Sequence, residues 1–157
     1  MRFRLLVSVL AAALLVPAGA AATIVLQKGM GGITIGMTEA QVRAKLGQPS
    51  KTVRGKNDFG RYTTLTYKRP AIRVNFQGNA GATGIDTSSP GERTARGIGV
   101  GSTVAAVKAK VPGVKCKTEF GFRHCYIGSF NPGTRVTDFV IAKTGKVSRV
   151  TVGIVID

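Results

Sequence analysis

Apolar residues recur along this chain with two different spacings, one helical and one alternating. After Thr38, the apolar residues Val42 and Leu46 fall four positions apart, which places them on one face of a helix. Further along, apolar and polar residues alternate at 64–68 and 72–77, as they do in half-buried strands. The pattern therefore predicts a short helix followed by antiparallel strands.

Local signals define both ends of this helix, which we expect over residues 39–46. Thr38 is a suitable N-cap, and Gln41 stands three positions later, where it can return a hydrogen bond as in a capping box. Gly47 suits the left-handed position that follows a helix, and Pro49 prevents continuation. The helix is predicted without reference to any tertiary contact.

The same combination returns 65 residues later. Residues 33–46 and 98–111 are identical at seven of fourteen aligned positions, and a duplicated folding unit is the economical explanation. In the second copy, Thr103 is the expected cap, and the helix should stop at Pro112-Gly113. Alternating strands are expected after each helix, with those of the second copy near 120–127, 136–142 and 147–156.

The repeat predicts an α+β fold of two tandem units, at residues 23–90 and 91–157. Each unit should place its helix on one face of an antiparallel sheet. A half of about 60 residues is only marginally stable alone. The two copies are therefore expected to share a core and form one compact unit.

Residues 1–22 have the layout of a secretory signal peptide. Two arginines near the start precede an unbroken apolar run at 5–16, and small residues follow. That run is shorter than the roughly 18 to 20 residues of a membrane-spanning helix. We expect cleavage after Ala20 or Ala22, a periplasmic or extracellular location, and no transmembrane segment in the mature chain.

The mature chain should be strongly basic. Loss of Arg2 and Arg4 lowers the formal net charge from +16 to +14. Six basic residues crowd the first copy's helix exit and strands, and we predict an anion-binding surface from them: Arg54, Lys56, Arg61, Lys68, Arg69 and Arg73. Such a cluster holds phosphates or carboxylates by charge, although a merely solvated basic face remains the alternative. Acidic envelope polymers, lipid headgroups or an acidic protein fit an exported chain better than nucleic acid does.

Cys116 and Cys125 are the only two cysteines. An even number in an exported chain predicts a disulfide, here between the exit of the second helix and the sheet. The alternative is a Cys125 thiol activated by His124. Adjacent strand residues point to opposite faces, which disfavours that alternative.

The sequence offers no recognisable catalytic set, metal site or cofactor site. His124 is the only histidine, and the seven acidic residues are scattered. The glycine-rich stretch at 97–101 lacks the preceding strand and the spacing of a phosphate-binding loop. We therefore expect a protein that is not an enzyme and that uses no cofactor.

A family resemblance follows from these motifs. The run Ile33-Thr34-Ile35-Gly36-Met37-Thr38, then Val42 and Leu46-Gly47-x-Pro49, resembles the signature of the SmpA/BamE-like bacterial envelope proteins. The duplication and the closely spaced cysteines resemble the tandem-repeat β-lactamase-inhibitor-like (BLIP-like) proteins. This chain has no lipidation cysteine, no tryptophan and only three tyrosines, whereas the inhibitors bind through an aromatic-rich sheet face.

The resemblance implies binding to an envelope or secreted protein. We therefore expect a secreted or periplasmic, non-enzymatic binding domain with a protein or cell-envelope partner. The alternatives are an inhibitor of a secreted enzyme, an anion-binding surface protein and, as a third, a hydrolase.

Overall fold

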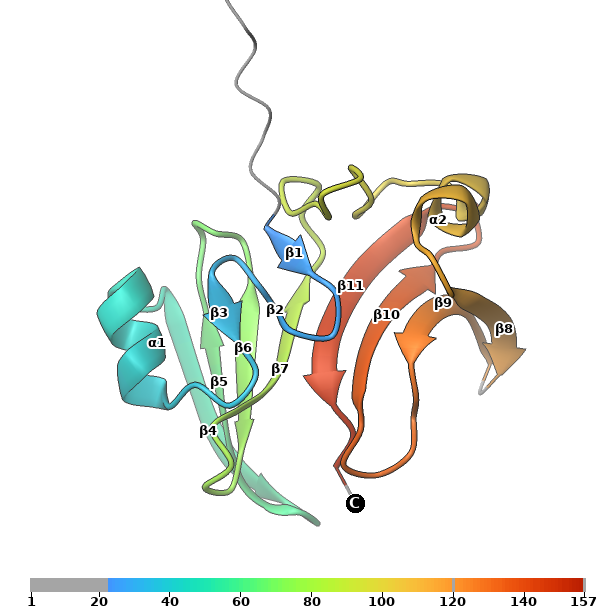
Figure 1. Cartoon of the computed structure of the whole chain (residues 1–157). Helices are drawn as coiled ribbons and strands as arrows, with labels where there is room; N and C mark the ends of the chain where they lie inside the picture. The colour runs from blue at the N-terminus through green and yellow to red at the C-terminus, as the bar shows by residue number, and fades with distance from the viewer. Residues whose placement is uncertain (1–22, 120, 157) are drawn as a thin grey trace, which may run out of the picture.

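Antiparallel pairing joins eight strands into one sheet (Figure 1). The computed structural model of the protein describes residues 23–119 and 121–156, so the predicted signal peptide 1–22 lies outside the described residues. The strand order across the sheet is β4-β5-β6-β7-β11-β10-β9-β8. These strands are β4 (Lys51–Asn57), β5 (Gly60–Thr66), β6 (Arg73–Gln77), β7 (Ala82–Thr87), β8 (Lys115–Glu119), β9 (Phe122–Gly128), β10 (Arg135–Ile141) and β11 (Val147–Ile154).

The expected α+β fold of two helix-plus-sheet repeats is wrong. The two helices, α1 (Glu39–Leu46) and α2 (Val104–Lys110), have only 8 and 7 residues. Strands make up 47% and helical residues 11% of the structure, so the fold is mostly β. A run of four strands follows each helix, and β7 pairs with β11, where Ile85 lies opposite Val152. This pairing merges the two runs into one continuous sheet.

The helices themselves begin and end where the sequence predicts. In α1, Gln41 N–H donates to Thr38 Oγ1 at 3.2 Å, and Thr38 N–H donates to Gln41 Oε1 at 2.9 Å, which completes the capping box. Gly47 follows with a φ of 76°, which glycine adopts without a steric penalty. In α2, Thr103 accepts from the backbone N–H of Ala106 at 3.2 Å, without a reciprocal side chain.

A small three-stranded sheet crosses the seam between β7 and β11. It consists of β1 (Ile24–Val25), β2 (Gly29–Met30) and β3 (Ile33–Thr34), and β2 contacts both β7 and β11 (Figure 1). The backbone N–H of Gln27 donates to Thr137 Oγ1 at 2.7 Å. This sheet and the helices cover the apolar face of the large sheet.

One hydrophobic core serves the whole described chain. Residues that lie opposite one another on neighbouring strands share a face, and the apolar ones meet the helices and the small sheet there. The fully buried members include Val42, Leu65, Val74, Ile85, Val107, Phe139, Val150 and Val152. Because both helices contribute to this cluster, neither half is packed independently.

The predicted disulfide is confirmed. Cys116 on β8 lies directly opposite Cys125 on β9, and their sulfur atoms are 2.08 Å apart. The disulfide is consistent with an extracytoplasmic location. Within the part of the chain that the structure describes, neither helix has the length and apolar character that crossing a bilayer requires.

Candidate functional site

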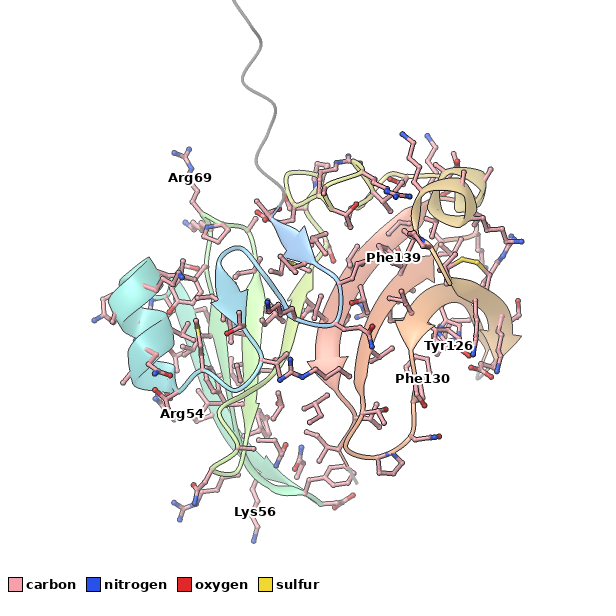
Figure 2. All side chains as sticks on the ribbon, in the orientation of Figure 1. Arg54, Lys56, Arg69, Tyr126, Phe130 and Phe139 are labelled. Carbon is pink, nitrogen blue, oxygen red and sulfur yellow. A yellow bond between two sulfur atoms is a disulfide. The ribbon has the colours of Figure 1, made fainter. Side chains whose placement is uncertain are left out.

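The six basic residues predicted to bind anions do not form one patch. Figure 2 shows Arg69 and Lys56 at opposite ends of the molecule, with Arg54 beside α1. Lys68 and Arg69 lie in the loop between β5 and β6. The structure brings together only Arg54, Lys56 and Arg61, which all lie on the hairpin formed by β4 and β5.

The three cations of this hairpin share one face. Lys56 lies directly opposite Arg61, and Arg54 lies opposite Thr63. Cross-strand partners point to the same side, as do residues two apart on one strand. The β4–β5 hairpin therefore presents three positive charges on a single surface.

The tip of the hairpin is a two-residue turn, Asp58-Phe59, with Phe59 56% exposed. Its position is fixed by side chains. Asn57 Oδ1 accepts from the Phe59 N–H at 3.0 Å, and the Asn57 and Gln77 amides exchange two hydrogen bonds of 3.1 Å. The tip thus offers an exposed aromatic ring on an anchored turn.

Beside the cations lies an open hollow of about 420 Å³. Its lining combines charged, aromatic and amide groups from β4, β5 and the turn after β6, namely Arg54, Gly55, Arg61, Tyr62, Thr63, Gly78 and Asn79. Guanidinium groups donate in a planar fork that matches carboxylates and phosphates. The hollow has the donors needed to hold an anionic group.

Positive charge on this surface is only partly neutralised within the molecule. Glu39 Oε1 accepts from both Arg43, at 2.8 Å, and Arg54, at 2.6 Å. One carboxylate therefore faces two guanidinium groups. In the described ranges, neither Lys56 nor Arg61 has a carboxylate within salt-bridge distance.

Arg73 has a different role from the hairpin cations. It lies on the opposite face of the sheet and donates through Nε to Asp86 Oδ1 at 2.9 Å. Asn75 donates to the other oxygen of Asp86 at 3.1 Å, and Asp86 is only 6% exposed. Arg73 thus balances a buried carboxylate, which leaves it less available to a ligand.

A second polar cluster surrounds His124, on the side of β9 opposite to Cys125. His124 Nδ1 lies 2.9 Å from Asp138 Oδ1, and its Nε2 lies 3.1 Å from Glu119 Oε1. A neutral imidazole has one N–H. Both contacts can therefore be hydrogen bonds at the same time only if the imidazole carries two protons or one of the two carboxyl groups is protonated.

Aromatic rings enclose this cluster. The rings of Phe122, Tyr126 and Phe130 lie 5.1, 5.3 and 5.5 Å from the His124 ring, which is 2% exposed. Tyr126 and Phe130 lie together on the β9 side of the molecule in Figure 2. Burial raises the pKa of the Asp138 carboxyl, while the neighbouring His124 opposes that rise.

This cluster could not be predicted from the sequence, because its members lie apart in the chain and on three different strands. The strand register brings its members together. Glu119 is the last residue of β8, and Asp138 lies on β10 two residues before Val140, the cross-strand partner of His124. Both ring nitrogens of His124 lie within hydrogen-bond distance of carboxylate oxygens. Among the described residues, no group of three or more His, Cys, Asp or Glu side chains is arranged to hold a metal ion.

Comparison with known proteins shows a shared fold but no family. No family model matches the chain, and no curated protein matches it. Its structure is similar to the crystal structure of a DUF4309 family protein (YjgB) from Bacillus subtilis subsp. subtilis str. 168, with a TM-score of 0.51 and 18% identity. The match covers 85% of this chain and 88% of that chain. At this identity the likeness concerns the fold alone, and the SmpA/BamE-like and BLIP-like resemblance stays a prediction.

Proposed function

We propose that this chain is an extracytoplasmic, non-enzymatic binding protein whose β4–β5 hairpin binds an acidic partner. The observation that carries this function is the placement of Arg54, Lys56 and Arg61 on one face of an exposed hairpin. An anion at this face would meet cations that lack sufficient counter-charge in the molecule. The partner is an acidic secreted or envelope protein, or an acidic envelope polymer.

Several features support a binding role over catalysis. The hairpin carries an exposed aromatic residue, Phe59, beside its charges, and binding surfaces are enriched in aromatic residues and arginine. The histidine has both nitrogens engaged. The signal-like segment and the disulfide support export, which places acidic polymers and secreted proteins within reach and nucleic acid out of reach.

Charge reversal on the hairpin tests this function. The mature chain (residues 23–157) would be titrated with fluorescent polyglutamate and with polyglycerol phosphate at about 0.1 M salt. We expect Lys56→Glu/Arg61→Glu to weaken binding at least about tenfold, because two attractive contacts become repulsive. All substituted side chains are exposed, so the variant should keep the stability of the parent.

A matched control separates a local site from net charge. Lys143→Glu/Lys146→Glu makes the same change in charge on the exposed hairpin between β10 and β11. We expect this control to bind within about threefold of the parent, since a distant charge is largely screened beyond roughly 10 Å. Equal losses in the two variants would show nonspecific attraction to a basic protein and contradict a hairpin site.

A further inference from the structure

Strand β4 is an open edge of the large sheet. Among the described strands it pairs only with β5, and all seven of its residues are exposed. An edge strand leaves every second backbone N–H and C=O unpaired. The other edge, β8, has five residues and is tied to β9 by the Cys116–Cys125 disulfide.

The backbone groups that face outward can be assigned from the neighbouring strand. Arg61 C=O accepts from the Gly78 N–H at 2.7 Å, so the backbone of Arg61 faces β6 and turns away from β4. In two antiparallel strands, residues that lie directly opposite each other either both direct their backbone N–H and C=O groups toward the other strand or both direct them away from it. Lys56 therefore presents its N–H and C=O to solvent, and alternation extends this to Arg54 and Thr52.

The two faces of this edge differ in chemistry. The residues with outward backbone groups include two of the three cations of β4, Arg54 and Lys56, whose side chains share one face. The other face carries Val53, which is 37% exposed, and Gly55, with the third cation, Lys51, at the start of the strand. The Tyr62 ring lies across Gly55, since a Cβ built at Gly55 would fall 2.6, 2.7 and 2.8 Å from three Tyr62 side-chain atoms.

Charge decides what can pair with such an edge. Edge lysines ordinarily discourage pairing between copies. Antiparallel pairing of two β4 strands would bring Arg54 and Lys56 of one copy near the same cations of the other, and opposed like charges destabilise a sheet. An acidic strand turns the same charges into attraction.

We propose that β4 binds an extended acidic segment of a partner protein as a ninth strand. In that segment acidic residues alternate with apolar ones. The acidic residues lie opposite Arg54 and Lys56 and form both the backbone hydrogen bonds and the ion pairs. The apolar residues contact Val53 and the Tyr62 ring. This mode of binding rests on the function proposed above and identifies its partner as a polypeptide.

Peptides with a modified backbone test strand addition. The probe is a fluorescent seven-residue peptide of alternating Glu and Val, titrated against the mature chain. One derivative carries N-methyl groups on its Glu residues and the other carries them on its Val residues. Both keep the charge and side chains of the parent peptide, but only the first removes the N–H groups that would face β4.

We expect the Glu-methylated peptide to bind at least about tenfold more weakly than the parent, because several backbone hydrogen bonds of about 1 kcal/mol each are lost. The Val-methylated peptide should stay within about threefold, because its altered groups face solvent. Equal binding of both derivatives and the parent would overturn strand addition and leave charge-based binding intact. Binding of polyglutamate but not of the parent peptide would also overturn strand addition. Failure of every acidic probe would instead overturn the proposed function.

Self-association is a separate outcome. Sedimentation equilibrium of the mature chain should show a monomer, because the β4 cations oppose pairing of two copies. A dimer that Lys56→Glu strengthens would identify the edge as a self-pairing site and contradict a partner strand.

Discussion

Tyr62 lies across Gly55 on the neighbouring strand, so that a side chain at residue 55 would meet the tyrosine hydroxyl at 2.6 Å. The glycine leaves room for the ring to reach the open edge of the sheet. The sequence has only three tyrosines and no tryptophan. One of these few large aromatic side chains therefore lies beside the open edge, on the face opposite to the hairpin cations.

Gly55→Ala should displace the Tyr62 ring and leave every charge in place. The ring is the flexible partner in this contact, so the change in unfolding free energy should be small, within about 1 kcal/mol. We expect weaker binding of the alternating Glu-Val peptide, by roughly threefold to tenfold, and unchanged binding of polyglutamate. Parallel titrations measure both. Unchanged peptide binding would show that the ring does not contact the partner.

Arg73→Ala should lower stability without weakening anion binding. Asp86 is 6% exposed, and loss of Arg73 leaves it with the Asn75 amide and no cation. A buried carboxylate that loses a charged partner destabilises the fold, here by about 1 to 2 kcal/mol because the arginine is half exposed. Urea unfolding measures the loss. A large decrease in polyglutamate affinity with normal stability would instead place Arg73 in the binding surface.

Removal of the disulfide should destabilise the second half of the sheet. The Cys116–Cys125 link closes a loop with a sequence separation of 9, and the loop-entropy model gives about 2 to 3 kcal/mol. Cys116→Ala/Cys125→Ala should therefore lower the unfolding free energy by about this amount in urea titrations. Reduction of the parent chain with dithiothreitol is the control and should produce a similar loss. No loss in either sample would contradict a structural role for the link.

Asp138 should make stability depend on pH in a recognisable direction. Burial raises the pKa of the folded carboxyl above its ordinary 3.8. Between these two pKa values the unfolded chain has released the proton while the folded chain retains it, so this contribution to stability falls as pH rises. Asp138→Asn lacks the group. The difference in unfolding free energy, parent minus variant, should therefore decrease from about pH 3.5 upward and then level off. An increase over that range would contradict the burial of this carboxyl.

Local signals allowed both helices to be predicted from the sequence. A cap at Thr38 or Thr103 and a glycine or proline stop act within a few residues, and each helix buries one valine fully in the core. The disulfide could likewise be predicted, because the chain has only two cysteines and each can pair only with the other. These features depend on neighbours in sequence rather than on the arrangement of the sheet.

The fold class could not be predicted in the same way, because the signals for the outer strands are weak. β4 lies at one edge with every residue exposed, and β8 lies at the other edge. Neither strand shows apolar alternation, which arises only where one face is buried. Because neither edge strand was predicted, the helices were expected to form a larger share of each half. No local signal in the sequence indicated that β7 pairs with β11.

The candidate sites were predictable only in part, for a related reason. Arg69, Arg73 and Lys56 are close in sequence and were therefore predicted to form one surface. Strand direction and alternation instead place their side chains at different ends of the molecule or on different faces of the sheet. The same register brings Glu119 and Asp138 to His124 from distant positions. Side-chain clusters on a sheet are set by pairing, which composition does not reveal.

The most direct test of a hairpin that binds acidic partners is the salt dependence of polyglutamate affinity, compared between the mature chain and Lys56→Glu/Arg61→Glu. We expect the affinity of the parent to fall at least about tenfold between roughly 50 and 300 mM salt, while the variant binds weakly throughout with a shallower slope. Identical affinities and slopes for the two proteins would contradict the assignment of the binding surface to β4 and β5.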